Sequence, residues 1–322
     1  MLHKIYSKAI LLLFVTTSLF SQELKPLIRL ETSGYINDLI IDDTKIYAAT
    51  TEGKVEIFDI YKKEKVGQIV FPLISSGRGD AVVARVLSID KLQDKLLLVT
   101  SASQGKKNIW IYTQGELKKV AQKSEDALVR KAQFIDEDHY LFATFASEAI
   151  LYAQEENYEQ YHRQLTQSRL SDMVMSEDKK RMVMADESGE VRLIEVNSSK
   201  EIALVGALNV DNIYKIAYKN GTILTGGQDR RVGVYGKGIA PYYLKSDFLV
   251  YCVGLCDDGG MGAYSRGFDH DIQIFEVKTK KERYRLVGHN SVINKIVFFT
   301  ETIIVSAGDA EEILIWQLPS GH

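Results

Sequence analysis

The stretch that decides the fold is GHNSVINKIVFFTETIIVSAGDAEEILIWQL, which runs from Gly288 to Leu318. The apolar residues from Ile293 to Phe299 predict one strand, and a second strand is predicted to reach a turn at Gly308-Asp309. A third predicted strand carries Trp316. Short strands joined by tight turns are typical of an all-β unit, so we expect similar units in the rest of the chain.

Weaker copies of the third strand recur along the chain. Seven segments of seven residues have a bulky apolar residue at the fifth position, and successive copies are separated by 54, 40, 42, 41, 40 and 41 residues. A propeller blade has four strands in about 40 to 45 residues, so five of these steps fit that period and the first is longer. The seven residues are Phe58, Tyr112, Tyr152, Ile194, Tyr235, Phe275 and Trp316.

The order of Gly-His, two strands, Asp in a turn and Trp in a strand resembles one WD40 repeat. In that family a His, a Ser or Thr, an Asp and a Trp form a chain of hydrogen bonds that fixes the turns of a blade. The resemblance implies an all-β, seven-bladed WD40-like β-propeller, and it implies a structural rather than a catalytic role for the matching residues. These are His289, Ser306, Asp309 and Trp316.

The turn aspartates of the last three repeats differ in spacing. Asp229 and Asp269 each stand six residues before the aromatic residue of their repeat, whereas Asp309 stands seven before Trp316. The resemblance implies that Asp229 and Asp269 bind back into their sheets. The turn at Asp309 is expected to be one residue longer.

The segment from Leu24 to Glu31 has strand character but precedes the first repeat. In propellers of this type the amino-terminal strand often becomes the outermost strand of the last blade. We therefore predict that this segment closes the ring, which removes the exposed edges of an open sheet. The propeller is expected to span residues 22–322.

The first 21 residues have a different character. Lys4 and Lys8 precede an apolar run from Ile10 to Phe20, and a cleavage site is predicted near Ser21. This pattern is typical of a secretory signal peptide, and the run is shorter than the roughly 20 apolar residues that span a bilayer. The expected location is the periplasm, without membrane insertion after cleavage; an uncleaved anchor is the alternative.

Charge argues against nucleic acid as a partner. The formal net charge is −3, and removing the two lysines of the predicted signal peptide makes it −5. No basic cluster stands out in the sequence, whereas nucleic-acid binding usually needs one.

Two segments are interpreted as connections between blades. Ser75 to Gly79 is rich in glycine and serine and lies in the part of the chain that holds the extra residues of the first step, and residues 155–171, with His162, are interpreted as a polar connector. Long loops in compact folds are often functional.

The two cysteines, Cys252 and Cys256, lie four residues apart in an apolar stretch. In one strand this spacing separates them by about 13 Å, which is too far for a disulfide. We expect two buried thiols. The methionines at 173, 175, 182 and 184 alternate in two predicted strands and are interpreted as core residues.

Catalytic chemistry is not indicated by the sequence, and neither a cofactor nor a metal is predicted. The histidines occupy unlike positions in the repeats, so no ring of ligands is expected. Two alternatives stay open: a calcium site at the turn aspartates, and a lactonase-like propeller hydrolase with a metal in its channel. The turn aspartates are Asp42, Asp43, Asp257 and Asp258.

Protein binding through surface loops is the favoured function. The candidate partner contacts are Arg78 and Asp80 in the long loop and Arg230 and Arg231 in a turn, because arginine is enriched at interfaces. Arg78-Gly79-Asp80 matches a cell-adhesion tripeptide, which recurs widely by chance.

Together with the predicted signal peptide, the stretches GGQDRRVGVY and YYLKSDFLVYCVGL are similar to NapL, a family of exported WD40-like propellers encoded with some periplasmic nitrate reductase systems. The resemblance implies a non-catalytic accessory or assembly factor whose partner is a nitrate reductase component. A scaffold for another envelope complex is the alternative.

Overall fold

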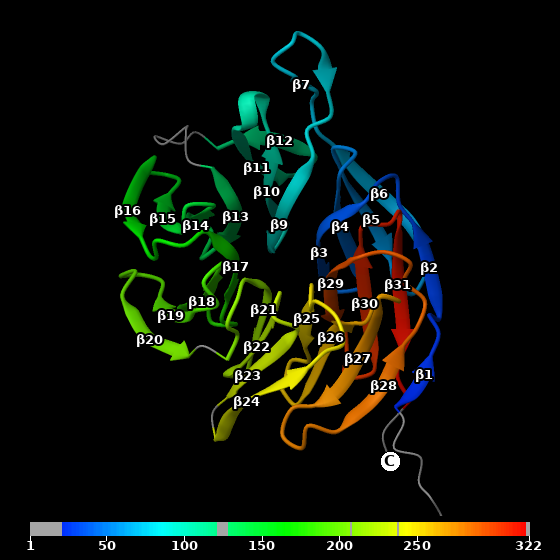
Figure 1. Cartoon of the computed structure of the whole chain (residues 1–322). Coiled ribbons are helices and arrows are strands. Elements are labelled where there is room, and N and C mark those ends of the chain that lie inside the picture. The colour runs from blue at the N-terminus through cyan, green and yellow to red at the C-terminus, as the bar shows by residue number, and fades with distance from the viewer. Residues whose placement is uncertain (1–20, 121–127, 207, 237, 320–322) are drawn as a thin grey trace, which may run out of the picture.

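The computed structural model describes residues 21–319 except 121–127, 207 and 237. Most of the predicted signal peptide lies outside these residues. The described strands form seven main sheets, arranged as blades around a common centre (Figure 1). The predicted seven-bladed β-propeller is therefore confirmed.

Blades one to six each contain a meander of four strands that follow one another from the innermost to the outermost. Blade one contains β3 (Ile36–Asp42), β4 (Lys45–Thr50), β5 (Lys54–Asp59) and β6 (Glu64–Val70). Blade two contains β9 (Val86–Leu92), β10 (Lys95–Ser101), β11 (Lys107–Thr113) and β12 (Glu116–Lys119). Blade three contains β13 (Val129–Phe134), β14 (His139–Thr144), β15 (Glu148–Ala153) and β16 (Tyr158–Gln164).

The remaining blades follow the same plan. Blade four contains β17 (Leu170–Met175), β18 (Arg181–Asp186), β19 (Val191–Glu195) and β20 (Glu201–Gly206). Blade five contains β21 (Ile213–Lys219), β22 (Thr222–Gly227), β23 (Arg231–Gly236) and β24 (Ile239–Lys245). Blade six contains β25 (Val253–Leu255), β26 (Met261–Arg266), β27 (Asp271–Glu276) and β28 (Glu282–Leu286), and blade seven begins with β29 (Ile293–Phe298), β30 (Ile303–Gly308) and β31 (Glu312–Gln317).

The strand directions define two faces. The first three strands of each blade are antiparallel to their neighbours, so each innermost strand begins at the same end as the turn between the second and third strands. The connections between blades also lie at this end, which we call the entry face. The turns between the third and fourth strands lie on the opposite face.

The amino-terminal segment closes the ring, but as two strands instead of the single strand expected. β2 (Ile28–Glu31) pairs antiparallel with β31 as the outermost strand of blade seven. β1 (Gln22–Leu24) pairs parallel with β28 and adds a fifth strand to blade six. Pro26 lies in the break between them, where it has no backbone N–H to donate to a ladder.

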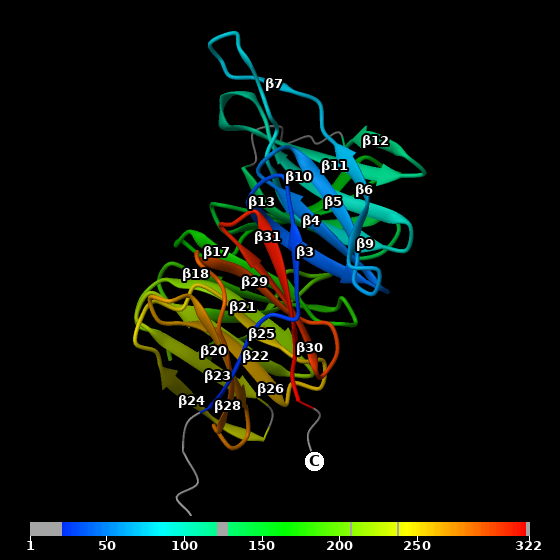
Figure 2. The same ribbon diagram turned by 90° about the vertical axis from the view of Figure 1, so that its right-hand side faces the viewer.

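Both predicted connections contain strands. Residues 155–171 are not a simple connector, because they contain β16, the outermost strand of blade three. Its sequence is polar because an outermost strand is largely exposed. The long loop of blade two forms a small ribbon of β7 (Ile74–Ser75) and β8 (Ala81–Val82), which projects from the ring in both Figure 1 and Figure 2.

The hydrophobic core lies between the blades. In the part of the chain that the structure describes, each of seven buried clusters combines residues of two neighbouring blades. Trp316 of blade seven, for example, packs in one cluster with Ile272 and Cys252 of blade six. The methionines at 173, 182 and 184 are buried between blades three and four, as predicted for core residues. Each blade therefore needs both neighbours to bury its two faces.

Blade seven contains a chain of three polar side chains. The Ser306 hydroxyl oxygen accepts a hydrogen bond of 2.8 Å from Trp316 Nε1 and shares one of 2.6 Å with His289 Nε2. Asp309 does not join them: its Oδ1 accepts a hydrogen bond from Asn294 Nδ2 at 2.7 Å. The expected fourth link is therefore absent, in agreement with the longer turn.

A chain that includes the turn aspartate occurs in blade five instead. Thr225 Oγ1 donates to Asn209 Oδ1 at 2.6 Å, and Asn209 Nδ2 donates to Asp229 Oδ1 at 2.9 Å. Asp229 also accepts from the backbone N–H groups of Val210 and Arg231, so it binds back into the sheet. Asn209 takes the place that His289 has in blade seven.

Asp269 does not bind back into blade six. Its side chain is 84% exposed and its nearest cation is Arg285, 4.0 Å away. The buried carboxylate of this turn is Asp271, which accepts a hydrogen bond of 2.6 Å from Arg285 Nε. The expectation for Asp269 is wrong because Asp271, two residues later, occupies the protected position.

Ring closure can be tested at Leu30, which is buried between blades seven and one. Replacement of Leu30 by Ala should lower the free energy of unfolding by about 2 to 4 kcal/mol, since it leaves a cavity at the closing strand. The matched control is Leu27→Ala, because Leu27 is 61% exposed. Urea denaturation measures both; an equal effect of the two changes would contradict closure by β2.

Trp316→Ala should lower the free energy of unfolding by about 3 to 5 kcal/mol, as is typical of removing a fully buried tryptophan. It also leaves the Ser306 hydroxyl with one partner fewer. Equilibrium denaturation followed by circular dichroism checks this. A loss below about 1 kcal/mol would be inconsistent with Trp316 as a core residue.

Because His289 is buried, we expect the stability of the protein to depend on pH. Burial, together with Arg29 and His270, lowers the pKa of its imidazole from 6.5 to about 4. The unfolded chain therefore takes up a proton below about pH 6.5 while the folded protein does not, so this contribution to stability is lost as the pH falls from 6.5 towards 4. The loss is about 1.4 kcal/mol for each unit of the pKa difference.

The measurement is the urea midpoint at several pH values for the unaltered protein and for His289→Gln. The variant should lose less stability between pH 6.5 and 4 than the unaltered protein. Identical pH profiles would show that His289 does not carry this dependence.

Candidate functional site

One equivalent position of each innermost strand lines the centre of the ring. In five blades this residue directly follows a β-bulge and is charged, and it stands opposite an alanine or a glycine. Ser88 follows the bulge of blade two, and Cys252 accepts a backbone hydrogen bond from Ser265 at the matching point of blade six. In blade order the seven residues are Asp38, Ser88, Lys131, Asp172, Lys215, Cys252 and Lys295.

These seven residues, which we call the channel ring, contain two close ion pairs. Lys295 Nζ lies 2.6 Å from Asp38 Oδ1, and Lys131 Nζ lies 3.0 Å from Asp172 Oδ1. Lys131 also donates to the carbonyl of Met173 at 2.6 Å. The pairs join blade seven to blade one and blade three to blade four, so their first role is structural.

The two carboxylates also bind the next blade along the chain. Asp38 Oδ2 accepts the N–H of Ile89 at 3.1 Å, and Asp172 Oδ2 accepts the N–H of Ile216 at 3.2 Å. Buried carboxylates are stable only when their lone pairs are engaged in this way. Both acids of the channel ring are therefore occupied by contacts within the protein.

The lysines keep these carboxylates ionised. Burial alone would raise the pKa of Asp38, but Lys295, Lys131 and Lys215 together bring it below its usual value. Burial likewise opposes ionisation of Asp172, yet Lys131 and Lys215 bring its pKa well below the usual range. Burial lowers the pKa of Lys131, an effect that Asp172 partly offsets.

Lys215 differs from the other lysines of the channel ring. No carboxylate of the described residues forms an ion pair or hydrogen bond with its ammonium group, although it lowers the pKa values of both ring aspartates. Two cavities of about 250 and 240 Å³ meet at Lys131, Asp172 and Lys215. The channel thus holds one more positive than negative charge within the ring.

A second feature is a row of aromatic rings on the entry face, between blades five and six. Tyr214 and Tyr251 stack with their centroids 5.2 Å apart, and Phe248 lies 6.2 Å from Tyr251. Phe248 lies 4.1 Å from Phe268, which is 73% exposed. We call these four residues the aromatic row. Large apolar side chains gathered on a surface in this way often mark a contact site.

Arg230 lies beside the aromatic row. Its backbone has a positive φ of 63°, its carbonyl accepts the N–H of Ser246 at 2.8 Å, and its side chain is exposed. Arg231, in contrast, donates to the carbonyl of Leu208 at 2.8 Å and lies over the ring of Tyr243. Of the two predicted contacts, Arg230 is available to a partner and Arg231 is engaged within blade five.

Arg78 and Asp80 lie on a separate projection. Both are exposed in the β7–β8 ribbon, whose turn is held by a hydrogen bond from Ser76 N–H to the Asp80 carbonyl. Figure 1 places this ribbon across the ring from blade five. The structure therefore does not bring the two pairs of predicted contacts together.

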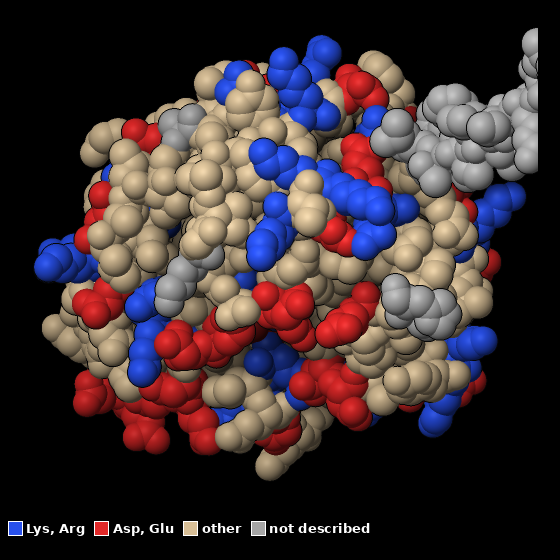
Figure 3. Space-filling model, turned by 90° about the horizontal axis from the view of Figure 1, so that it is seen from below, with Lys and Arg blue, Asp and Glu red and all other residues tan. Residues whose placement is uncertain are grey.

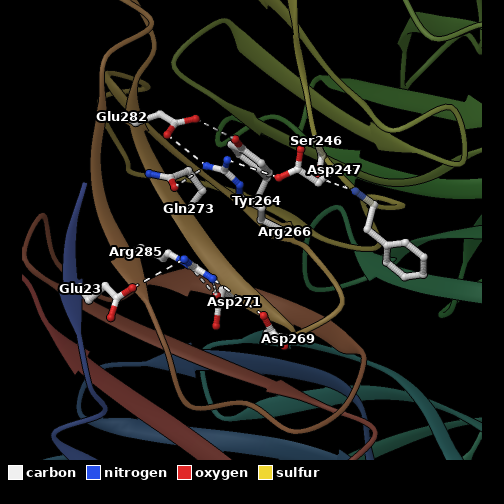
Figure 4. A network of polar contacts seen from close by, with 11 residues as sticks. Glu23, Ser246, Asp247, Tyr264, Arg266, Asp269, Asp271, Gln273, Glu282 and Arg285 are labelled. Atoms are coloured by element: carbon white, nitrogen blue, oxygen red, sulfur yellow. Dashed lines mark hydrogen bonds and ion pairs between the residues drawn. The ribbon is translucent and has the colours of Figure 1, made fainter. Parts of the chain in front are cut away.

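A network of polar contacts holds the connection between blades five and six that carries Phe248 of the aromatic row. Figure 4 shows Arg266 between Asp247, Gln273 and Glu282, at distances of 3.4, 3.0 and 3.0 Å. Asp247 directly precedes Phe248, so this guanidinium holds the connection that carries the row.

The same view shows how the amino-terminal strand is attached to blade six. Arg285 lies between Glu23 of β1, at 3.6 Å, and the buried Asp271 (Figure 4). This cluster could not be predicted from the sequence, because its members are separate charged residues on different strands.

Two of the turn aspartates are engaged by lysines. Asp42 pairs with Lys91 and Asp257 with Lys219, each at 2.7 Å. Across the described ranges, no group of three or more His, Cys, Asp and Glu side chains could hold a metal ion.

In those same ranges no helix is long and apolar enough to cross a membrane. Figure 3 shows acidic and basic side chains intermixed on the side of the molecule seen from below.

Comparisons with known proteins show the fold. No protein-family model matches the sequence, and no curated protein matches it. Among the solved structures, the β-propeller domain of Cps50 (Swd1) from Myceliophteria thermophila matches with a TM-score of 0.72 and 14% identity. The match covers 91% of this chain and 99% of that domain. The chain has a seven-bladed, WD40-like β-propeller fold.

Proposed function

We propose that this propeller is a non-catalytic protein-binding scaffold whose contact surface is the aromatic row together with Arg230. The observation that carries the proposal is the exposure of Phe268 at the end of a row of packed rings. Aromatic and arginine side chains supply much of the binding energy of protein interfaces, and here they adjoin on one face.

The surface is also preorganised. The connection that carries Phe248 and Tyr251 is fixed by hydrogen bonds from Ser246 N–H to the Arg230 carbonyl and from Val250 N–H to the Gly227 carbonyl. Tyr214 donates its hydroxyl to Gln228 Oε1 at 3.0 Å. A partner therefore meets side chains that are already ordered, which lowers the entropic cost of binding.

The finer part of the proposal concerns location and partner. An exported propeller that assists a periplasmic nitrate reductase fits the signal-like first 21 residues and the two stretches similar to NapL. On this proposal the partner is a reductase component and the protein works in the periplasm.

The proposal is tested by affinity capture of partners from the organism's own periplasmic extract, with mass spectrometry. The double variant Phe268→Ala, Arg230→Ala should recover at least about tenfold less of the partner, because one hot-spot residue alone contributes about 2 kcal/mol or more and about 1.4 kcal/mol is a tenfold change in affinity. The control is Tyr61→Ala, Lys62→Ala, on the opposite face, where Tyr61 is 65% exposed. This control should recover as much as the unaltered protein.

The possible outcomes separate the two parts of the proposal. Equal recovery by both double variants would rule out the aromatic row as the contact. A captured partner that depends on the row but is unrelated to nitrate reductase would keep the scaffold and reject the reductase assignment.

A further inference from the structure

The entry side of the channel contains a buried hydroxyl without a partner. Ser88, the channel-ring residue of blade two, is 2% exposed, and its Oγ has no hydrogen-bond partner among the described residues. A buried hydroxyl in this state costs roughly 1 to 3 kcal/mol, so native structures usually supply a partner. Ser88 lines the cavity of about 250 Å³ together with Arg130 and Lys215.

Two cations of this cavity, Lys215 and Arg130, form no direct ion pair within the described residues. The Arg130 guanidinium lies over the face of the Phe145 ring, 5.1 Å from its centroid. Burial lowers the pKa of Arg130, an effect that Asp172 partly offsets. At this cavity, hydrogen-bond donors are therefore in excess of the acceptors that they contact directly.

The acids of the cavity cannot balance this excess by direct contact. Asp38 accepts from Lys295 and from the N–H groups of Leu39 and Ile89. Asp172 accepts from Lys131 and Ile216. A cation entering the cavity would meet carboxylates already engaged by lysines, whereas an anion would meet donors that lack acceptors.

We propose that the entry-side cavity of the channel binds a small oxyanion, such as a carboxylate or phosphate ion, through Lys215, Arg130 and the hydroxyl of Ser88. The two cations neutralise the anion, and Ser88 donates a hydrogen bond to one of its oxygens. The cavity of about 250 Å³ has room for such an ion together with several waters, because one water occupies about 30 Å³ in the liquid. The site is separate from the aromatic row and does not depend on the proposed scaffold function.

The test is isothermal titration calorimetry of the mature protein with inorganic phosphate and, separately, with acetate, at low chloride and neutral pH. Saturable binding with one site per chain is expected. Lys215→Gln should weaken it by about tenfold or more and Ser88→Ala by less, since a charged contact contributes more than a neutral hydrogen bond. Lys215→Arg should retain binding, because it keeps the charge.

The matched control is Lys245→Gln, which removes the same charge from an exposed site at the end of the outermost strand β24. It should bind as the unaltered protein does. Thermal denaturation of each variant shows that the ring is intact. Absence of saturable binding for both anions, or equal weakening by Lys215→Gln and Lys245→Gln, would overturn the proposal; the first result would mean that water alone satisfies Ser88.

Discussion

The pairing of β2 with β31 is the interaction on which the rest of the structure depends. The blades contact mainly their neighbours, so seven of them form a stack with two open ends unless the first and last are joined. β2 supplies the outermost strand of blade seven from the opposite end of the chain, and Leu30 carries that strand into the core shared with blade one. Closure therefore protects a sheet edge and completes an interblade core at the same time.

The charges at the centre of the ring serve the same architecture. Inner strands of neighbouring blades are not joined by a continuous backbone ladder, and Asp38, Asp90 and Asp172 partly replace one by accepting N–H groups of the next blade. Lysines keep Asp38 and Asp172 ionised by bringing their pKa values below the usual range, whereas burial raises the pKa of Asp90. Lys215 is the exception in this arrangement, and a charge that exceeds what the architecture uses is a reason to look for a ligand.

The repeat could be predicted from sequence because Phe58, Trp316 and their equivalents must all fill the same space between blades. β16 was missed because its outward position allows residues such as Gln160 and Arg163, which give no apolar signal. The polar chain of blade five was missed because Asn209 replaces the expected histidine. The channel ring carried a signal that alignment of the seven repeats would have found: one column holds Asp, Ser, Lys, Asp, Lys, Cys and Lys. Its ion pairs, however, could not be predicted in this way, because they depend on which ring residues of neighbouring blades the fold brings within reach of each other.

The burial of the two thiols has a consequence for redox chemistry. Burial raises the pKa of Cys252 to about 11, and burial together with the hydrogen bond to Asp258 raises that of Cys256 to about 11. Only the thiolate attacks disulfides and oxidants, and the raised pKa keeps both thiols protonated at neutral pH. A chain with two cysteines and no disulfide between them can thus pass through an oxidising compartment in its folded form without cross-linking to other proteins.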